Sequence, residues 1–416
     1  MRSIRNAVAG AAMSVAIALL TSSVQQPVAR AADGPDDLGL QRARTHAHVL
    51  YRTDQGVSCT VEDVAFAPNA EPMHVIKAAR TGKLASGLNI VLRATNQLES
   101  FPQAKEAFLR AAGIWEAQIA SSITVIVDVD FGPKRFGHPY EPLVIGSTDA
   151  QDLVGDGLYS STRSALINRA SNSQELSLYN TLPTGSLPTD IGSINSMAVS
   201  SANLRALGLI SAVANPPAEP NFGDPPAIGF NSKFAYDFDP TNGIDSDKTD
   251  FEAVAVHELG HVLGFGSNVG LEELQPSFID SFTTLDLFRF RPGVNLGNFS
   301  ASTRILHSGG TQIFFAGGPN LEFSTGRPDG SGGDGQQASH WKDDVQTGNF
   351  IGIMDPTIGD GQRERITTND LAAFNVIGYR LASEVPVTVD SASASLRGDE
   401  LTITAHGSST AGPITG

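Results

Sequence analysis

Alternating apolar positions predict the first ordered segment of the chain. Between residues 87 and 94, Leu88, Ile90 and Leu92 fall on one side of an extended backbone. A period of two is typical of a strand with one buried face. Residues 32–85 before it show no sustained period and contain Pro, Gly and mixed charge. We therefore expect the main domain to begin at residue 86, after an N-terminal extension or prosegment.

A helix and a second strand are predicted to follow. Ser100, Pro102 and Gln103 have the pattern of a helix start, with a capping side chain and a proline in the first turn. Residues 122–132 are rich in β-branched side chains, which favour a strand. Strand, helix and strand in this order predict an α+β fold in which a helix packs on a sheet. The apolar face of the helix contains Ala104, Phe108, Ala111, Trp115 and Ile119.

The central part of the chain is less regular. Residues 157–171 and 193–210 are predicted to form helices, and proline-rich loops follow the second of them. Alternation returns in residues 227–238, which are predicted to form another strand. Residues 383–416 form a C-terminal tail. This tail is either one or two strands of an accessory module or a flexible end.

Two further helices have recognisable ends. Residues 251–263 are apolar on nearly every side, and a helix of this kind is buried. Thr249 and Glu252 stand in capping-box spacing before it, and Gly264 is placed to end it. A short closing helix is predicted near the C-terminus, where capping side chains and a terminal glycine recur. Those residues are Thr367, Asp370 and Gly378.

The buried helix carries candidate chemistry. His257 and His261 lie one turn apart on the same face, so both imidazoles can reach one metal ion. Glu258 is one step round the helix, where its carboxylate can accept a proton from water beside the ion. Two helical histidines can also be plain polar surface residues, but unpaired polar groups in an apolar helix are costly. The pattern H-E-x-x-H therefore predicts one catalytic zinc ion.

The third ligand of this site is not in the helix. The position ten residues after His257 is Ser267, and a neutral hydroxyl is a weak zinc ligand. His340 and His307 are the two histidines between the helix and Met354. His340 is favoured because it precedes a bulky Trp, where the chain returns to packed structure. The alternatives are His307 and the carboxylates of Glu272, Glu273 and Asp280.

Two blocks of sequence resemble the metzincin group of zinc metallopeptidases. HELGHVLGFGS, residues 257–267, matches the family pattern H-E-x-x-H-x-x-G-x-x-H except at Ser267. This departure is similar to the leishmanolysin type, in which the third histidine comes much later. Residues 338–358 resemble the His-Trp pair and the methionine turn of the same family. The resemblance implies His340 as the third ligand and Met354 as an apolar residue beneath the zinc.

The resemblance also implies a fold. It covers residues 86–380 through the order of their elements, although only the two blocks are specific. A zincin catalytic domain, residues 86–382, would contain a mixed twisted sheet, the active-site helix, and a C-terminal subdomain with the Met-turn and a closing helix. The cysteine-rich character of leishmanolysin-type enzymes is absent, since Cys59 is the only cysteine.

Composition and charge limit the partners. With 416 residues, of which 40% are hydrophobic, the chain can bury one large core or two smaller cores. The net charge of −16 argues against nucleic acid and anionic membranes as partners. A single cysteine excludes an internal disulfide. Cys59 is either a small buried residue or a thiolate that occupies the open zinc position and keeps the enzyme latent.

The N-terminus has the features of an export signal. Arg2 and Arg5 precede an apolar run at residues 7–20, and a small-x-small cleavage site ends at Ala31. The run is shorter than the roughly 20 residues of a membrane span. We therefore expect residues 1–31 to be a cleaved signal peptide, with an uncleaved anchor as the alternative. The mature protein would be secreted, without a membrane span, and monomeric.

These observations predict a secreted zinc-dependent endopeptidase with Glu258 as general base. Its protein or peptide substrate would bind as an extended strand along the edge formed by residues 227–236. A zinc hydrolase of cell-wall or other non-protein amides and an inactive zincin-fold adhesion module are the alternatives. Calcium is a weaker prediction, because the acidic turn at residues 237–250 does not fit the register of an EF-hand.

Overall fold

The computed structural model describes most of the chain beyond its N-terminus. The predicted signal peptide, residues 1–31, lies outside the described residues, as do Glu272 and Glu273. No described helix has the length and apolar character that crossing a membrane requires. The described ranges are 38–43, 47–54, 56–62, 72–81, 86–271, 280–327, 332–384, 387–397 and 400–409.

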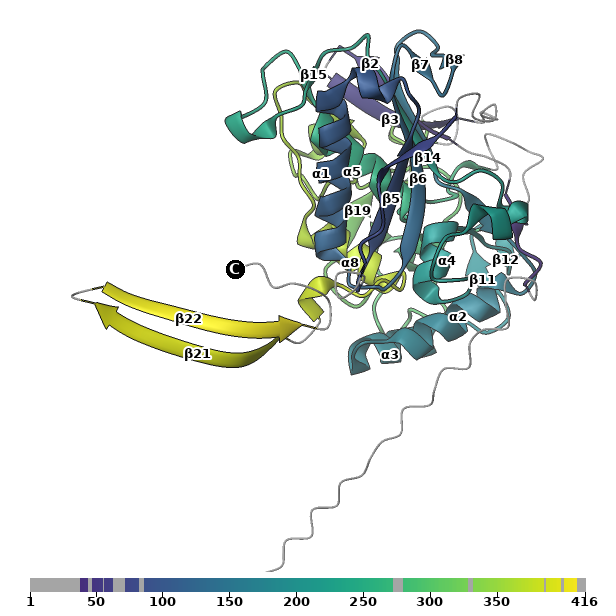
Figure 1. The fold of residues 1–416 in the computed structure, drawn as a ribbon. Coiled ribbons are helices and arrows are strands. Elements are labelled where there is room, and N and C mark those ends of the chain that lie inside the picture. The colour runs from purple at the N-terminus through teal and green to yellow at the C-terminus, as the bar shows by residue number, and fades with distance from the viewer. Residues whose placement is uncertain are drawn as a thin grey trace, which may run out of the picture. The chain divides into compact units, whose positions relative to one another are not determined.

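An eight-stranded mixed sheet lies at the centre of the fold (Figure 1). The strands, in sheet order, are β20 (Thr357–Ile358), β3 (Gly56–Glu62), β2 (Ala47–Thr53), β9 (Val144–Asp149), β14 (Ala227–Asn231), β6 (Thr124–Gly132), β5 (Asn89–Ala94) and β4 (His74–Lys77). Strands β5, β6 and β14 are parallel, and the remaining neighbours pair antiparallel. The described chain is therefore α+β, with strands at the two positions predicted before and after the first helix.

The helices and the smaller strands complete the described structure. The helices are α1 (Pro102–Gln118), α2 (Leu158–Arg169), α3 (Ser173–Asn180), α4 (Ser201–Leu207), α5 (Phe251–Val262), α7 (Asp344–Thr347) and α8 (Thr368–Val376). The smaller strands are β1 (Gln41–Arg42), β7 (Lys134–Arg135), β8 (His138–Pro139), β10 (Asp152–Val154), β11 (Leu187–Thr189), β12 (Gly192–Ile194), β13 (Ala198–Ser200), β15 (Tyr236–Asp237), β16 (Thr249–Asp250), β17 (Arg289–Phe290), β18 (Gln312–Phe314), β19 (Leu321–Phe323), β21 (Val387–Arg397) and β22 (Glu400–Ser409).

Helix α1 has the predicted apolar face but a different start. Its N-cap is Phe101, and no side chain caps it, so the prediction of Ser100 as the cap is wrong. Ser100 instead ends a short 3-10 turn. Pro102 in the first turn lacks an N–H, which leaves one fewer amide to satisfy. All five predicted face residues are buried, and the indole of Trp115 donates a hydrogen bond of 2.8 Å to the carbonyl of Val256 on α5.

Helix α5 has its N-cap one residue later than predicted. Asp250 is its N-cap and accepts a 3.0 Å hydrogen bond from the amide of Ala253. Thr249 lies in β16 and donates its hydroxyl to Asp360, so the predicted capping box is wrong. The predicted end is confirmed, because Gly264 follows the last turn with φ of +107°, where glycine avoids the steric cost of a side chain.

The predicted substrate edge is not an edge. Strand β14 pairs with β6 on one side and with β9 on the other, so its backbone donors and acceptors are already used. All five of its residues are buried, as expected for a strand covered on both faces. The prediction that a substrate pairs with residues 227–236 is therefore wrong. Strand β9 separates β14 from β2.

The N-terminal strands belong to the same sheet. Strand β2 pairs antiparallel with β9, and β3 pairs with both β2 and β20. Strands β2 and β3 come from residues 32–85, the region expected to be an extension or prosegment. They therefore add to the sheet that also contains β5 and β6.

The remaining predictions are confirmed in part. Helix α2 lies in the predicted range, but residues 193–210 contain strand β13 before the short helix α4. Ser200 ends the strand and caps the helix, accepting a hydrogen bond from the amide of Asn203. Helix α8 begins with the predicted capping box of Thr367 and Asp370. The tail contains two paired strands, β21 and β22.

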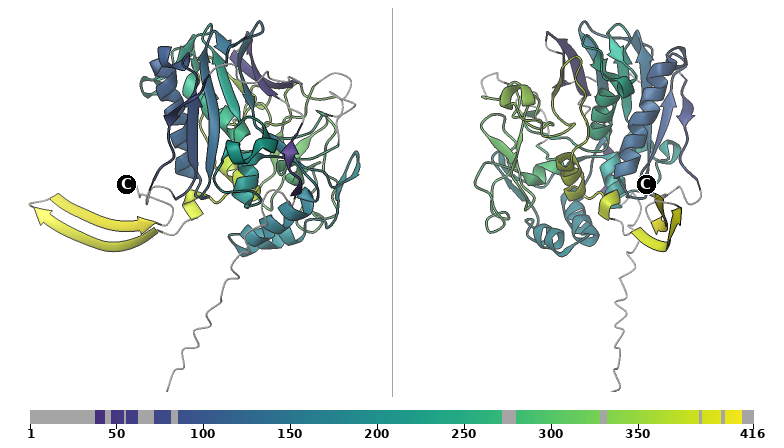
Figure 2. Two further views of the ribbon diagram at one scale, coloured as in Figure 1. Left: turned by 45° about the vertical axis from the view of Figure 1, so that its right-hand side comes forward. Right: turned by 90° about the vertical axis from the view of Figure 1, so that its left-hand side faces the viewer.

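Much of the chain after α5 lies on the side of this helix away from α1, but α8 reaches α1, where Phe374 contacts Trp115. In the right-hand view of Figure 2 the green segments are on the left and α1 is on the right. Helices α1 and α5 pack together, and α5 also contacts β9. Helix α5 is thus held between the sheet and the later part of the chain.

Candidate metal centre

Three histidine side chains converge in the interior. His257 and His261 lie on α5, and His340 lies between β19 and α7. The Nε2 atoms of His257 and His261 are 3.1 Å apart, and each is 3.2 Å from Nε2 of His340. All three side chains are buried. The structure thus brings together the residues that were predicted to be metal ligands.

The other ring nitrogen of each histidine contacts a backbone carbonyl. The pairs are His257 with Ile353 at 2.7 Å, His261 with Phe265 at 2.7 Å, and His340 with Gln337 at 3.0 Å. A carbonyl oxygen only accepts hydrogen bonds, so each Nδ1 must donate. A neutral imidazole has one proton, and the lone pair is therefore on Nε2. Three Nε2 lone pairs face one another.

The rings are neutral at pH 7 without a metal. Burial lowers the pKa of His257 to about 4. Burial and neighbouring histidines lower the pKa values of His261 and His340 well below their usual value. Converging lone pairs repel unless a cation lies between them. Zinc with Zn–N bonds of about 2.0–2.1 Å keeps tetrahedral nitrogens about 3.3 Å apart, close to the 3.1–3.2 Å found here.

The other candidates for third ligand lie elsewhere. His307 is half exposed, with its Nδ1 3.6 Å from a carboxylate oxygen of Asp190. Asp280 is exposed, and Glu272 and Glu273 are outside the described residues. His340 is fully buried and has a nitrogen beside both helical histidines. The geometry therefore favours His340 over His307 and Asp280.

Glu258 lies beside this centre. Its Oε1 is 4.0 Å from Nε2 of His257. Neither carboxylate oxygen has a hydrogen-bond partner among the residues that the structure describes, although the side chain is fully buried. Burial raises the pKa of Glu258 to about 8. A buried carboxylate without a partner is costly unless a cation or water satisfies it.

Met354 lies under α5. A Cβ added to Gly260 would be 2.4 Å from the sulfur of Met354, so the side chain packs directly against the helix backbone between Glu258 and His261. Met354 is fully buried. Asp370 on α8 supports the same region, accepting hydrogen bonds from the indole of Trp341 at 2.8 Å and the amide of Ile353 at 2.9 Å. The segment that contains Met354 is thus tied to the segment that carries His340.

Two residues of the N-terminal strands also lie against this centre, and the sequence had not indicated the first of them. His48 on β2 stacks on His261, with ring centroids 3.6 Å apart. Cys59 on β3 has its sulfur within 4.8 Å of donor atoms of His48, His261 and His340, and also of His257 and Glu258. Burial, with a smaller effect of Glu258, raises the pKa of the Cys59 thiol. No local pattern marks His48, whereas Cys59 was considered from the sequence both as a small buried residue and as a thiolate in the open zinc position.

A second group of side chains could hold a metal ion. Asp343, Asp344 and Asp355 place carboxylate oxygens within 4.8 Å of one another. The acidic turn considered for calcium contributes no such group within the described ranges. Asp237 in that turn instead accepts hydrogen bonds from the amides of Asp239 and Asp245.

The second acidic group predicts a pH dependence of stability. Burial, with nearby carboxylates, raises the pKa of Asp355 to about 8 and that of Glu364 to about 10. The folded state then holds protons that the unfolded state releases near pH 4, so the free energy of unfolding should fall as pH rises from about 4 to 8. Asp355→Asn, which imitates the protonated acid, should reduce this fall. Urea unfolding at pH 5 and pH 8 with a chelator measures it, and an equal fall in both proteins would contradict the assignment.

Comparisons with family models, with curated proteins and with solved structures find no match to this chain.

Proposed function

We propose that the protein is a secreted zinc-dependent endopeptidase of the metzincin type. The observation that supports this most is the convergence of three neutral Nε2 atoms at 3.1–3.2 Å beside the unpartnered carboxylate of Glu258. Imidazole nitrogens suit zinc and some other transition metals. Three protein ligands leave a fourth position for chemistry, as in catalytic rather than structural zinc sites. The packing of Met354 against Gly260 agrees with the family resemblance.

The residues divide the chemistry among them. His257, His261 and His340 would hold the ion, which supplies Lewis acidity when bound. Glu258 would accept a proton from the attacking water and deliver it to the leaving amine. The Nδ1 hydrogen bonds to carbonyls hold the rings in place.

Two other functions remain as alternatives. A zinc hydrolase of cell-wall or other non-protein amides would use the same residues. An inactive zincin-fold adhesion module would not need Glu258, whose buried carboxylate is costly without a catalytic role. Incubating the purified protein with a peptide mixture and with cell-wall peptides separates these possibilities. Cleavage of peptides alone supports the endopeptidase, and cleavage of neither supports the module.

The N-terminal strands bear on regulation of the proposed enzyme. Strand β2 occupies one side of β9, and residues of β2 and β3 lie against the buried histidines. If β2 and β3 were displaced, β9 would become a sheet edge able to pair with an extended substrate. We therefore move the proposed substrate edge from β14 to β9.

Replacing Cys59 tests whether its thiol keeps the enzyme latent. If the thiol takes the open zinc position, Cys59→Ser should raise kcat/KM of the full-length chain, about tenfold for each 1.4 kcal/mol of sulfur–metal bonding lost. Ser58→Ala is the matched control. Ser58 precedes Cys59 on the same strand, and its hydroxyl donates to Gln336 instead of to the histidines. Peptide cleavage by the unprocessed proteins measures the effect. Equal rates for Cys59→Ser and wild type would leave Cys59 as a small core residue.

A further inference from the structure

Ser267 occupies the position where the extended motif has its third histidine, and the structure gives it another contact. Its backbone amide donates a 2.8 Å hydrogen bond to the hydroxyl of Ser339, the residue directly before His340. The same hydroxyl lies 3.3 Å from the carbonyl of Ser267 and donates to it. Both serines are buried. The residue after the helix turn is therefore joined to the distant segment that carries His340.

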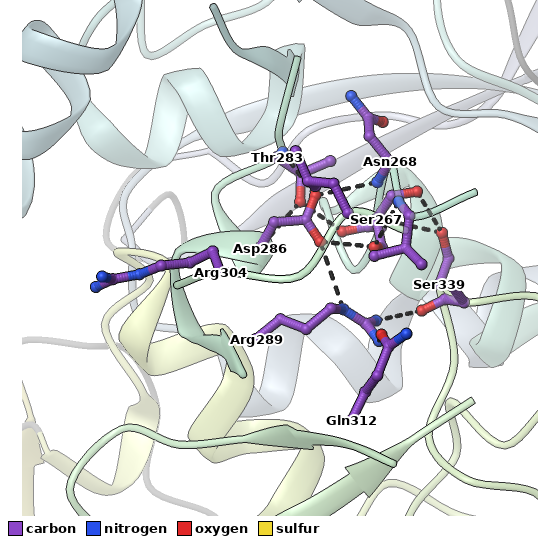
Figure 3. A network of polar contacts seen from close by, with 12 residues as sticks. Ser267, Asn268, Thr283, Asp286, Arg289, Arg304, Gln312 and Ser339 are labelled. Atoms are coloured by element: carbon purple, nitrogen blue, oxygen red, sulfur yellow. Dashed lines mark hydrogen bonds and ion pairs between the residues drawn. The ribbon is translucent and has the colours of Figure 1, made fainter. Parts of the chain in front are cut away.

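A buried carboxylate holds this turn. Asp286 accepts hydrogen bonds from the Ser267 hydroxyl at 2.6 Å, the Asn268 amide at 3.0 Å and the Thr283 amide at 2.9 Å (Figure 3). Thr283 in turn donates its hydroxyl to the carbonyl of Gly266 at 2.7 Å. Asp286 has no exposed surface. These bonds fix the backbone on both sides of Ser267.

Arg289, which lies beside Asp286, contacts the segment that carries His340. Its Nε is 3.6 Å from Oδ1 of Asp286, and both side chains are fully buried. Its guanidinium donates to the carbonyl of Ala338, the second residue before His340, and at 2.8 Å to the side-chain oxygen of Gln312. Figure 3 shows Arg289 between Asp286 and Gln312. One buried ion pair thus contacts both segments that meet at the metal centre.

We infer that the Asp286–Arg289 pair, acting through Ser267 and Ser339, positions His340 as the third metal ligand. The inference rests on the proposed zinc site. His340 is 79 residues beyond His261, and closing so long a loop has an entropic cost that local order must offset. Partners that orient a metal ligand typically change metal affinity or activity by roughly 10–100-fold. These are positioning residues, because none of them reaches the converging nitrogens.

The test compares Ser339→Ala with Ser201→Ala. Ser201 is also buried, and its hydroxyl donates a 2.6 Å hydrogen bond to Gln151, away from the histidines. Ser339→Ala should weaken zinc binding by roughly 10–100-fold in competition with a chelator. The visible spectrum of the cobalt-loaded protein should also change, because it reports ligand geometry. Ser201→Ala should leave both measurements unchanged, and the thermal midpoints of the two metal-free variants should be similar.

Asp286→Asn provides an independent arm. The double variant Asp286→Asn/Ser339→Ala should lose less zinc affinity than the sum of the two single losses, because both residues hold His340 through the same set of contacts. Equal zinc affinity and equal cobalt spectra in Ser339→Ala and wild type would overturn the inference while leaving the zinc site intact. A wild-type protein that binds no zinc would instead overturn the proposed function.

Discussion

Replacing Glu258 by alanine is expected to abolish peptide hydrolysis while the protein keeps about one zinc per chain. Glu258 lies beside the converging histidine nitrogens but is not one of the three proposed ligands. Its Oε1 is 4.0 Å from Nε2 of His257. Removing the base should lower kcat by roughly 10²–10⁴-fold. Metal analysis and a peptide cleavage assay on the same preparations measure both quantities. The two results together separate a catalytic role from a metal-binding role.

A second substitution controls for the space that alanine leaves. Glu258 has no exposed surface, so truncation creates a cavity and removes a carboxylate at the same time. Glu258→Gln keeps the shape but cannot act as a base at neutral pH. It should therefore be as inactive as Glu258→Ala while unfolding at a temperature closer to that of wild type. Wild-type activity in either variant would sink the proposed mechanism.

Replacing His340 by alanine is expected to remove most of the zinc affinity. His340 supplies one of the three Nε2 atoms, and it is the one farthest in sequence from the motif. Zinc affinity should fall by more than the roughly 10–100-fold seen when a residue that only orients a ligand is removed. Because a ligand that binds only the folded state stabilises it, added zinc should raise the unfolding temperature of wild type but not of His340→Ala. Chelator competition and thermal unfolding with and without zinc measure these effects.

His307→Ala is the matched control for the third ligand. His307 is half exposed and pairs with Asp190 rather than with the other histidines. Zinc affinity and the zinc-induced rise in unfolding temperature should remain those of wild type. If His340→Ala keeps one zinc with wild-type affinity, the third ligand was assigned wrongly. His48 and Cys59, whose donor atoms lie within 4.8 Å of that of His261, would then be the next candidates.

The local patterns predicted elements better than their ends or neighbours. The 3.6-residue period of Phe108, Ala111 and Trp115 correctly indicated one buried face of α1. The caps of α1 and α5 were each misplaced by one residue, because Ser100 and Thr249 are used in a 3-10 turn and a strand pair instead. Strand β14 was expected at an edge, since an alternating pattern does not reveal how many strands lie beside it.

Local sequence was sufficient to predict the part of the site that lies on one helix. His257, Glu258 and His261 are brought to one region by the 3.6-residue turn, which requires no information about distant segments. The place of His340 depended on a resemblance and on an adjoining Trp. Its Nε2 lies 3.2 Å from those of His257 and His261 because of how distant segments pack in the folded chain.

The surroundings of the site likewise depend on contacts between distant segments. His48 and Cys59 reach it because β2 and β3 join the sheet beyond β9, and that order is set by packing of the whole sheet. Asp286 and Arg289 hold Ser267 and Ala338 together although no motif marks either residue. Such contacts join segments far apart in the chain, whereas sequence periodicity reports only neighbours within a few turns. The residues on α5 are therefore placed by local helix geometry, whereas His340 and the residues around the site are placed by contacts between distant segments.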